Sequence, residues 1–291
     1  MKLAILLLCH KNPKQINKFL EIMNHPRISF FIHIDKKNNF SEDIIKRENI
    51  LLLPHDLLQN IRWGDISMVQ AILNLINYSN SKGYFDYFWL CSGQDFPIKP
   101  VKEIIKFFDD KTCNFINLFN SKNYIGNFNN YDKRNSLYFP KWMISNNLLQ
   151  KIIKRIYIEV TGGYNKTLFF NRKNITNFNF YFGSTWWCLN KKTIDWIINY
   201  CKEHKEYFNF YKNCANPDES FFHTLVLNSP YKNIIEEYLH YIDWTGCRNH
   251  PKTLTMYDFN KIKQSKFLMA RKFDIDVDEE IIRELEINLG N

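Results

Sequence analysis

Four short apolar runs alternate with segments of helical periodicity in the first half of the chain. The runs are Leu3–Leu8, Phe30–Ile34, Ile50–Leu53 and Tyr87–Leu90. Each has the length of a strand that is buried on both faces, about four to eight residues. Helical periodicity fills the intervals that begin at Asn12 and at Ser67. Strands that alternate with helices build a mostly parallel sheet covered on both faces, so the sequence predicts an α/β fold.

Regular patterns return in the last third of the chain. Gly183–Leu189 is predicted as a strand and Lys192–His204 as a helix. Asn216 precedes an apolar helical run through Val226. Because Asn is favoured at helix N-termini, we expect a helix to begin there. A further strand is expected near Tyr241–Trp244.

The middle of the chain, residues 120–181, is rich in Asn, Lys and aromatic residues and has only weak periodicity. We interpret it as an excursion over the sheet. Phe267–Lys272 is interpreted as the end of a polar loop, and Glu279–Leu289 as a terminal helix. No repeat, low-complexity linker or composition break divides the sequence, so residues 1–291 are predicted to form one domain.

Several polar or aromatic residues follow the predicted strands. His10, Asp35 and Asp95 stand just past a strand end, and Trp63 lies in the loop after the third strand. Ligands of parallel sheets bind beyond the carboxyl ends of the strands. We therefore expect these four side chains to converge on one cleft.

The chain carries a formal net charge of +9, which favours phosphorylated or otherwise anionic partners. Its lysines are scattered, and the sequence contains no zinc-ligand spacing, RNA-recognition motif or basic helix-turn-helix pattern. Nucleic acid is therefore not an expected partner.

The seven cysteines are odd in number, dispersed and mostly set among apolar residues, as expected of buried thiols in a reducing cytoplasm. The opening apolar run stops at Cys9-His10 without a small-residue cleavage site, so we interpret it as a strand and not as a signal peptide. No stretch approaches the roughly 20 apolar residues that span a bilayer. Any membrane contact is therefore expected to be peripheral.

Carboxylates suited to a metal ion are sparse at the predicted cleft. Asp95 is the single acid at the end of the fourth strand, and one carboxylate is a poor site for a divalent cation. The run Asp274-Ile275-Asp276-Val277-Asp278 heads the terminal helix, where acids stabilise the helix N-terminus without a metal. Fixed cations must then hold any anionic ligand, and Arg271 and Lys272 are the candidates.

Other candidate residues are ambiguous when each is taken alone. Glu219 has the position of a first-turn carboxylate that stabilises a helix N-terminus. His223, one turn later, fits a packed helix residue. A pair such as Arg271-Lys272 occurs in any basic chain. None of these residues assigns a chemistry by itself.

Eight sequence blocks in a fixed order remove this ambiguity. They are Leu-Cys-His-Lys (8–11), Phe-Ile-His-Ile-Asp-Lys-Lys (31–37), Ile-Arg-Trp-Gly (61–64), Cys-Ser-Gly-Gln-Asp-Phe-Pro-Ile-Lys (91–99), Gly-Ser-Thr-Trp-Trp (183–187), Pro-Asp-Glu-Ser-Phe-Phe-His-Thr (217–224), Asp-Trp-Thr-Gly-Cys (243–247) and Phe-Leu-Met-Ala-Arg-Lys-Phe-Asp (267–274). Together they resemble the core-2/I-branching enzyme family, which also holds the protein O-xylosyltransferases. The resemblance covers nearly the whole chain.

The resemblance implies a single GT-A-type, Rossmann-like nucleotide-sugar-binding domain that acts with inversion and needs no metal or other cofactor. Glu219 matches the family's catalytic base, and Arg271 with Lys272 matches the basic pair that holds the diphosphate of a UDP-sugar donor. Asp35 and Trp63 match uridine contacts. The remaining expected donor-site residues are His10, Asp95, Ser184 and Lys252. Residues 120–181 would then lie on the acceptor side.

The sequence departs from the family pattern at two places. Thr185 stands where xylosyltransferases carry an Asp that serves the acceptor serine, which disfavours xylosyl transfer to protein. The loop from Arg248 to Lys252 is longer than in xylosyltransferases, and of its two ends we favour Lys252 as a phosphate ligand. We expect none of the membrane anchor, stem and disulfides of the animal enzymes here. We therefore expect a bacterial, cytoplasmic relative, peripheral at the inner face of the membrane, that builds lipopolysaccharide or capsule.

Three functions stay open at this point. Transfer of N-acetylglucosamine from its UDP-sugar to a glycan or glycolipid acceptor is favoured. The alternatives are transfer from another UDP-sugar such as UDP-xylose, and a glycan- or polyanion-binding protein without activity. Glycoside hydrolysis would need two facing carboxylates, and Asp218 and Glu219 are adjacent helix positions that point apart.

Overall fold

The computed structural model describes residues 1–119, 134–135, 138–139, 142, 148–163, 178–232, 235–246 and 250–290. Arg248 and most of the predicted excursion 120–181 lie outside these ranges. The strands in the described part are β1 Leu3–Cys9, β2 Ile28–Ile34, β3 Ile50–Leu52, β4 Tyr87–Ser92, β5 Asp95–Pro97, β6 Asn114–Ile116, β7 Trp187–Asn190, β8 Ile235–Glu236, β9 His240–Ile242 and β10 Met269–Arg271.

The α-helices in the same ranges are α1 Pro13–Ile22, α2 Ser67–Lys82, α3 Val101–Asp109, α6 Leu148–Val160, α7 Lys191–Glu203, α8 Lys205–Tyr211, α9 Phe221–Asn228, α10 Phe259–Lys263 and α11 Glu279–Asn288. Short 3₁₀ turns are η1 Ser41–Asp43, η2 His55–Leu57, η4 Pro217–Glu219 and η5 Met256–Asp258. The four strands predicted in the first half of the chain and the helices that follow the first and third of them are confirmed.

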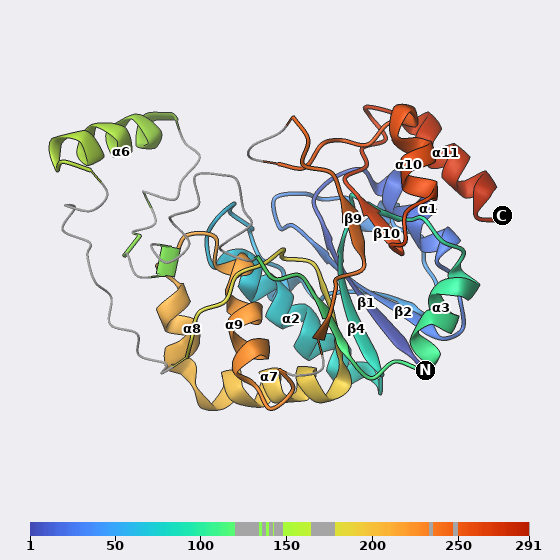
Figure 1. Ribbon diagram of the computed structural model, residues 1–291, viewed down its shortest axis with the longest axis horizontal. Coiled ribbons are helices and arrows are strands. Elements are labelled where there is room, and N and C mark those ends of the chain that lie inside the picture. Colours follow the sequence, from blue (N-terminus) through green and yellow to red (C-terminus); the bar gives the residue numbers. More distant parts are fainter. Residues whose placement is uncertain are drawn as a thin grey trace.

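A seven-stranded sheet with the order β3-β2-β1-β4-β7-β6-β8 forms the centre of the fold (Figure 1). The four strands from the first half of the chain run parallel: β1 pairs with β2 from Leu3 opposite Ile28, and with β4 from Leu3 opposite Tyr87. β7 runs antiparallel to both of its neighbours, β4 and β6. The predicted α/β class with a mostly parallel sheet is therefore confirmed.

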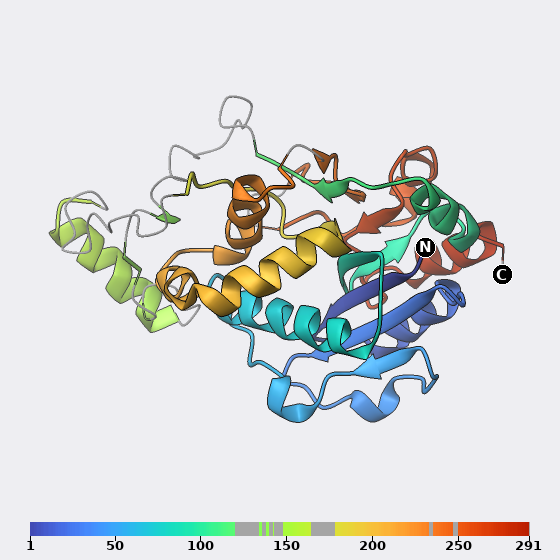
Figure 2. The same cartoon turned by 90° about the horizontal axis from the view of Figure 1, so that it is seen from below.

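Helices cover both faces of this sheet, as the unbroken apolar runs require. Alternate residues of β1 enter two hydrophobic clusters, with Leu3, Ile5 and Leu7 in one and Ala4 and Leu6 in the other. The first cluster includes side chains of α1, α3, α10 and α11. The second includes side chains of α2, α7, α8 and α9, and Figure 2 shows α2 and α7 side by side on this face.

A second, three-stranded sheet lies beside the first and has the order β5-β10-β9. β10 runs antiparallel to β5, so Arg271 is opposite Asp95, and parallel to β9. Two sequence-based expectations were wrong here. The segment interpreted as the end of a polar loop contains β10, and the strand predicted over Gly183–Leu189 occupies only Trp187–Asn190. Both strands are three or four residues long, too short for periodicity to define them.

Within the described residues, no helix is long and apolar enough to cross a membrane. None of the six cysteines in this part forms a disulfide, and Cys9, Cys91, Cys188 and Cys214 are buried. The interpretation of these cysteines as thiols set in the core is thus correct for those four, whereas Cys113 and Cys201 are partly exposed. Cys247 lies outside the described residues.

Candidate active site

A pocket of about 370 Å³, here called the central pocket, opens where the two sheets meet. Its walls come from loops that follow β3 and β4, from the ends of β9 and β10, and from the segment that enters β7. Because β7 runs antiparallel to β4, the start of β7 and the end of β4 lie at the same edge of the sheet. The residues that this edge brings together include Trp63, Gln94, Ser184, Thr185, Trp186, Asp218, Glu219, Trp244, Arg271 and Lys272.

Glu219 reaches the central pocket from a 3₁₀ turn and not from the helix predicted to begin at Asn216. Asn216 adopts a left-handed conformation with φ 49° and makes no side-chain cap, so the chain forms η4 before α9 begins at Phe221. Two backbone hydrogen bonds fix this turn: Asn216 N–H donates to Gly64 O at 3.0 Å, and Gly183 N–H donates to Glu219 O at 2.9 Å. The loop that carries Trp63 is thereby joined to the turn that carries Glu219.

Close packing beneath this turn explains why residue 183 is Gly. A Cβ atom there would lie 1.8 Å from the backbone oxygen of Asn117 and 2.5 Å from Nε2 of His223. His223 is completely buried, and burial lowers the pKa of its ring to about 3, so the ring stays neutral. The interpretation of His223 as a packed helix residue is confirmed.

The electrostatic surroundings of Glu219 suit a proton acceptor. Its side chain is 27% exposed at the wall of the pocket and forms an ion pair with Arg134. Burial raises the pKa of Glu219 to about 7, while the Arg134 guanidinium lowers it and neighbouring Asp218 raises it. A carboxyl group with a pKa near 7 can accept a proton at neutral pH and release it again.

Asp218 is engaged by a different partner. The hydroxyl of Thr185 donates to Oδ2 of Asp218 at 2.7 Å, and burial raises the pKa of this carboxyl above its ordinary value. The two adjacent acids therefore bind different groups, Thr185 and Arg134, as expected of carboxylates that point apart. Asp218 and Glu219 do not form the facing pair that glycoside hydrolysis needs.

Arg271 provides a fixed cation at the pocket wall. Its Nη1 lies 2.6 Å from Oδ1 of Asp95, and its guanidinium carbon lies 4.0 Å from the centre of the Trp186 ring. His240, which is fully buried, places Nε2 3.3 Å from the second oxygen of Asp95. An ion pair on one side and an aromatic ring on the other hold the guanidinium in one orientation.

Asp95, a predicted donor-site residue, lies behind Arg271 and does not line the central pocket. Its carboxylate is fully buried and accepts a hydrogen bond from Ser92 N–H at 2.8 Å in addition to the contacts with Arg271 and His240. Burial acts to raise its pKa, but Arg271 and His240 outweigh this effect and the pKa of Asp95 lies below its ordinary value. Asp95 thus acts through Arg271, because the core covers its oxygens.

These contacts also decide how well Asp95 suits a metal. Among the described residues, Cys91, Asp95 and His240 form the one group whose ligand atoms lie close enough to share an ion. Burial raises the pKa of the Cys91 thiol well above its ordinary value, so the thiol keeps its proton, and Arg271 already neutralises the carboxylate. A divalent cation at this group would have to displace Arg271 from Asp95 and the proton from Cys91.

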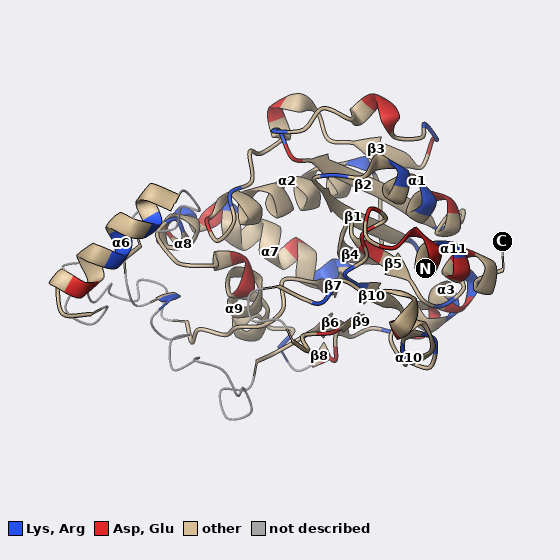
Figure 3. Ribbon diagram, turned by 90° about the horizontal axis from the view of Figure 1, so that it is seen from above, with Lys and Arg blue, Asp and Glu red and all other residues tan. Residues whose placement is uncertain are grey.

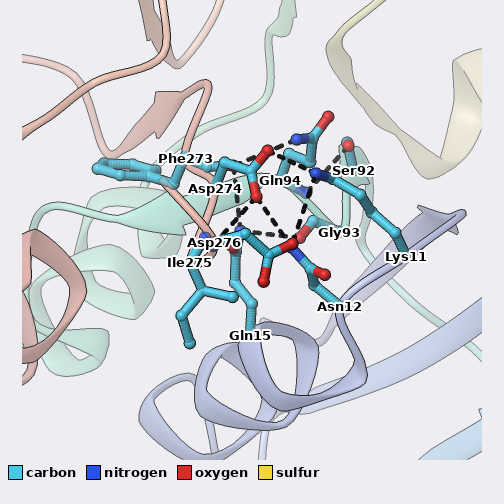
Figure 4. Close-up of polar contacts among 10 residues, drawn as sticks. All are labelled: Lys11, Asn12, Gln15, Ser92, Gly93, Gln94, Phe273, Asp274, Ile275 and Asp276. Atoms are coloured by element: carbon cyan, nitrogen blue, oxygen red, sulfur yellow. Dashed lines mark hydrogen bonds and ion pairs between the residues drawn. The ribbon is translucent and has the colours of Figure 1, made fainter. Parts of the chain in front are cut away.

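Polar contacts tie the chain just after Lys272 to the start of α1 (Figure 4). The carboxylate of Asp274 accepts from Lys11 Nζ at 2.5 Å and from Asn12 Nδ2 at 2.9 Å. The expectation that acids of the run Asp274–Asp278 stabilise the N-terminus of the last helix is confirmed for Asp278, which caps α11 by accepting from Ile281 N–H. Asp274, the first acid of the run, forms an ion pair with Lys11.

Gln15 of α1 connects the same segment to the turn after β4. Its Nε2 donates to Gly93 O at 3.0 Å, and its Oε1 accepts from Ile275 N–H at 2.9 Å (Figure 4). Phe273 N–H donates to Gln94 O at 2.8 Å. Residues more than 170 positions apart in sequence are joined in this way, and the Arg271-Lys272 pair is held at the sheet edge.

The other predicted donor residues lie at different distances from the central pocket. Trp63 lines it and is 62% exposed, and Ser184 lines it as well. His10 does not line it, but burial and the charges of Lys11, Arg271 and Lys272 lower the pKa of His10, which places the imidazole in the field of those cations.

Asp35 and Lys252 are not brought into the pocket wall. Asp35 is buried at the end of β2, where its carboxylate lies 3.4 Å from Lys37 Nζ, and its neighbour Lys36 lines a separate cavity of about 490 Å³. The ammonium of Lys252 lies 2.6 Å from Oδ1 of Asp258. Contacts of these two residues with a donor remain predictions.

Sequence reasoning missed several residues of the central pocket. Arg134 belongs to the segment with only weak periodicity, and no local signal links it to Glu219. Trp186 and Trp244 stand inside blocks that the resemblance rests on, but no role was assigned to them. A search for aromatic residues within those blocks would have found both.

Comparison with known proteins supports a common origin. A model of the Core-2/I-branching enzyme family matches residues 3–267. Xylosyltransferase 2 of Rattus norvegicus is 23% identical over 99% of this chain, and the xylosyltransferase of Ciona intestinalis is 22% identical over 99%. The chain spans about a third, 34%, of the length of each of these relatives.

A solved structure of galactosyltransferase LgtC with donor and acceptor sugar analogs aligns over 99% of this chain and 96% of its own, with 10% identity and a TM-score of 0.37. With a family match over most of its length and glycosyltransferases as its relatives, the chain belongs to the Core-2/I-branching enzyme family.

Proposed function

We propose that this chain is a metal-independent, inverting glycosyltransferase that moves a sugar, most favourably N-acetylglucosamine, from a UDP-sugar to a hydroxyl of a glycan acceptor. The proposal rests on one observation: a carboxylate suited to accept a proton and a pair of cations suited to bind a diphosphate line the same pocket. Glu219 offers a carboxylate with a pKa of about 7, and Arg271 with Lys272 offers fixed positive charge.

Glu219 is the proposed general base. Its carboxylate accepts the proton of the acceptor hydroxyl as the hydroxyl oxygen attacks the anomeric carbon of the donor sugar. The bond between that carbon and the diphosphate oxygen breaks on the opposite face, which inverts the configuration. The proton ends on Glu219 and the bonding electrons leave with UDP.

Arg271 and Lys272 are proposed to stabilise the negative charge that develops on the departing diphosphate. Arg271 is already oriented by Asp95 and Trp186, so little reorganisation is needed when the phosphate arrives. The same arrangement supports metal independence, because the acid at the end of β4 binds a guanidinium and has no oxygen directed at the pocket.

Trp63, Asp35, His10 and Ser184 are proposed to bind the nucleoside and sugar parts of the donor. Trp63 offers an exposed indole at the pocket wall for ring stacking. Lys252 is kept as a proposed phosphate ligand. In that role it must exchange its ion pair with Asp258 for one with phosphate.

A second donor, UDP-xylose, is favoured by one observation: relatives that match over nearly the whole chain include xylosyltransferases of Rattus norvegicus and Ciona intestinalis. Thr185, which stands in the block where xylosyltransferases carry an acidic residue, binds Asp218 and disfavours xylosyl transfer to a protein serine. A glycan in surface polysaccharide or lipopolysaccharide is therefore the acceptor class that we propose.

Release of UDP from a panel of UDP-sugars, with and without saturating EDTA, tests the proposal. We expect one UDP-sugar to be turned over at the same rate with and without EDTA. UDP-N-acetylglucosamine is the favoured donor, and UDP-xylose is the second candidate. Loss of turnover in EDTA with recovery in magnesium or manganese would disprove metal independence. Binding of glycans without turnover of any donor would identify a binding protein instead of an enzyme.

A further inference from the structure

Helix α6, Leu148–Val160, exposes an apolar face. The aliphatic side chains of this face are between 48% and 80% exposed, and they are Leu148, Leu149, Ile152, Ile153, Ile156 and Val160. Both ribbon views place α6 at one end of the molecule, away from the central sheet (Figures 1 and 2). Six large aliphatic side chains on one short helix are far more than the scattered apolar residues of an ordinary surface.

The exposed aliphatic residues share one side of the helix. Their spacing of three, four and seven residues confines them to an arc of about 140° at 100° per residue. Tyr157 and Ile158, which lie outside this arc, are partly buried, and Tyr157 contacts Trp142 with ring centres 5.8 Å apart. The helix is therefore attached by one side and presents the aliphatic side outward.

Cations border one edge of the aliphatic side. Lys151 and Arg155 are exposed next to Leu148 and Ile152 along the helix, and Figure 3 shows Lys and Arg repeated along α6 with acid at one end. The acid is Glu159, whose carboxylate lies 4.0 Å from Arg155. With Lys151, Lys154 and Arg155 against Glu159, the helix carries a net charge of +2.

We propose that α6 is a docking surface for an anionic lipid bilayer, in which the helix lies in the plane of the membrane interface with its aliphatic side among the acyl chains. Helices of this kind combine an apolar face with flanking Lys and Arg, and they insert about 5–10 Å into the boundary between headgroups and chains. Lys151 and Arg155 are then at headgroup level, where each cation strengthens binding to an anionic surface about fivefold.

The composition of the face favours lipid over a second protein surface. Protein interfaces are enriched in aromatic residues, Met and Arg, and depleted in Lys. The apolar residues of the exposed arc are Leu, Ile and Val without an aromatic residue, and Lys stands at its border. Glu159 also falls within the arc, near its edge, where Arg155 pairs with it. Acyl chains need no shape complementarity to cover such a face, whereas a protein partner does. The inference is independent of the glycosyltransferase proposal because it concerns no residue of the central pocket.

Sedimentation with vesicles tests the docking surface on the full chain. The probes are phosphatidylcholine vesicles with and without about one third phosphatidylglycerol. Wild type is expected to bind the anionic vesicles, and Ile152→Asp/Ile156→Asp to bind them at least tenfold more weakly. Lys151→Gln/Arg155→Gln should bind anionic vesicles more weakly than wild type, and its binding should depend less on salt concentration. The matched control is Ile287→Asp, which changes a 62% exposed isoleucine of α11 and should bind like wild type.

Two outcomes would overturn the proposal. One is equal sedimentation of wild type and Ile152→Asp/Ile156→Asp, with unchanged melting temperatures as proof that both are folded. The other is a concentration-dependent dimer in analytical ultracentrifugation that the same variant abolishes while vesicles bind none of the proteins, which would assign the face to a second copy of the chain. UDP release measured on each variant in the absence of vesicles should match wild type.

Discussion

Replacing Glu219 by Gln separates its proposed role as a base from a role in holding η4 in place. Gln preserves the size of the side chain and can still accept a hydrogen bond from Arg134, but it cannot take a proton from an acceptor hydroxyl. We expect UDP affinity to be unchanged and sugar transfer to fall by about 10²- to 10⁴-fold, the range typical of a lost general base.

The stability of the same variant is predicted to depend differently on pH. In the folded chain the pKa of Glu219 is raised from 4.5 to about 7. Because each pKa unit corresponds to about 1.4 kcal/mol, keeping this carboxylate ionised costs the folded state roughly 3 kcal/mol. A raised folded pKa means that the stability is fully present below pH 4.5 and is lost as the pH rises through 7. Glu219→Gln removes this titration.

Urea unfolding of both proteins at pH 5 and pH 8 measures that difference. Relative to the variant, wild type should lose up to about 3 kcal/mol of unfolding free energy between these two values. The transfer rate of wild type should rise over the same interval with a midpoint near pH 7, because the ionised carboxylate is the active form. A folded Gln variant that transfers sugar at the wild-type rate would remove Glu219 from the mechanism, and parallel stability profiles would show that its pKa is not raised.

Three further substitutions, with one control, test the surroundings of Glu219 and the proposed phosphate site. Lys272→Ala should weaken UDP binding by about 1.5–3 kcal/mol in calorimetry, whereas Lys36→Ala should have little effect, and equal losses would indicate a diffuse basic surface. Arg134→Gln removes the cation that lowers the pKa of Glu219, so the midpoint of the pH–rate profile should move upward; an unchanged midpoint would contradict this coupling. Gly183→Ala should lower the melting temperature, since its Cβ would clash with a backbone oxygen at 1.8 Å and overpacking costs about 1–3 kcal/mol. A variant as stable as wild type would show that the neighbouring residues can move to accommodate the methyl group.

The sequence predicted the parallel half of the sheet well because strands buried on both faces leave continuous apolar runs. Every residue of β1 is buried, which makes its pattern unambiguous. β10 left no such signal: it has three residues and continues directly into charged residues. Its place is fixed by pairing with β5 and β9, and long-range pairing of this kind does not appear in local periodicity.

The candidate site shows the same limit. The block that contains Glu219 located the residue, but its local structure was predicted incorrectly. The left-handed backbone of Asn216 leads into a 3₁₀ turn where a helix was expected to begin. Asp95 was located at the right strand end, yet only the fold shows that it is buried beneath Arg271. Arg134 could not be found from the sequence, since its contact with Glu219 spans 85 positions.

Two pairs of a carboxylate and a guanidinium lie at the central pocket, Asp95 with Arg271 and Glu219 with Arg134. The two pairs differ in the pKa of the carboxyl group. At the proposed phosphate end the carboxylate of Asp95 stays ionised, because Arg271, His240 and Ser92 N–H outweigh the effect of its complete burial on its pKa. At the proposed acceptor end the base must change its protonation state, and there Arg134 offsets only part of the effect of burial on the pKa of Glu219, which lies at about 7. A second cation beside Glu219 would lower its pKa and favour its ionised form, as Arg271 and His240 together do at Asp95. The unequal compensation of burial by neighbouring cations at Asp95 and Glu219 is therefore the structural feature on which the proposed reaction depends.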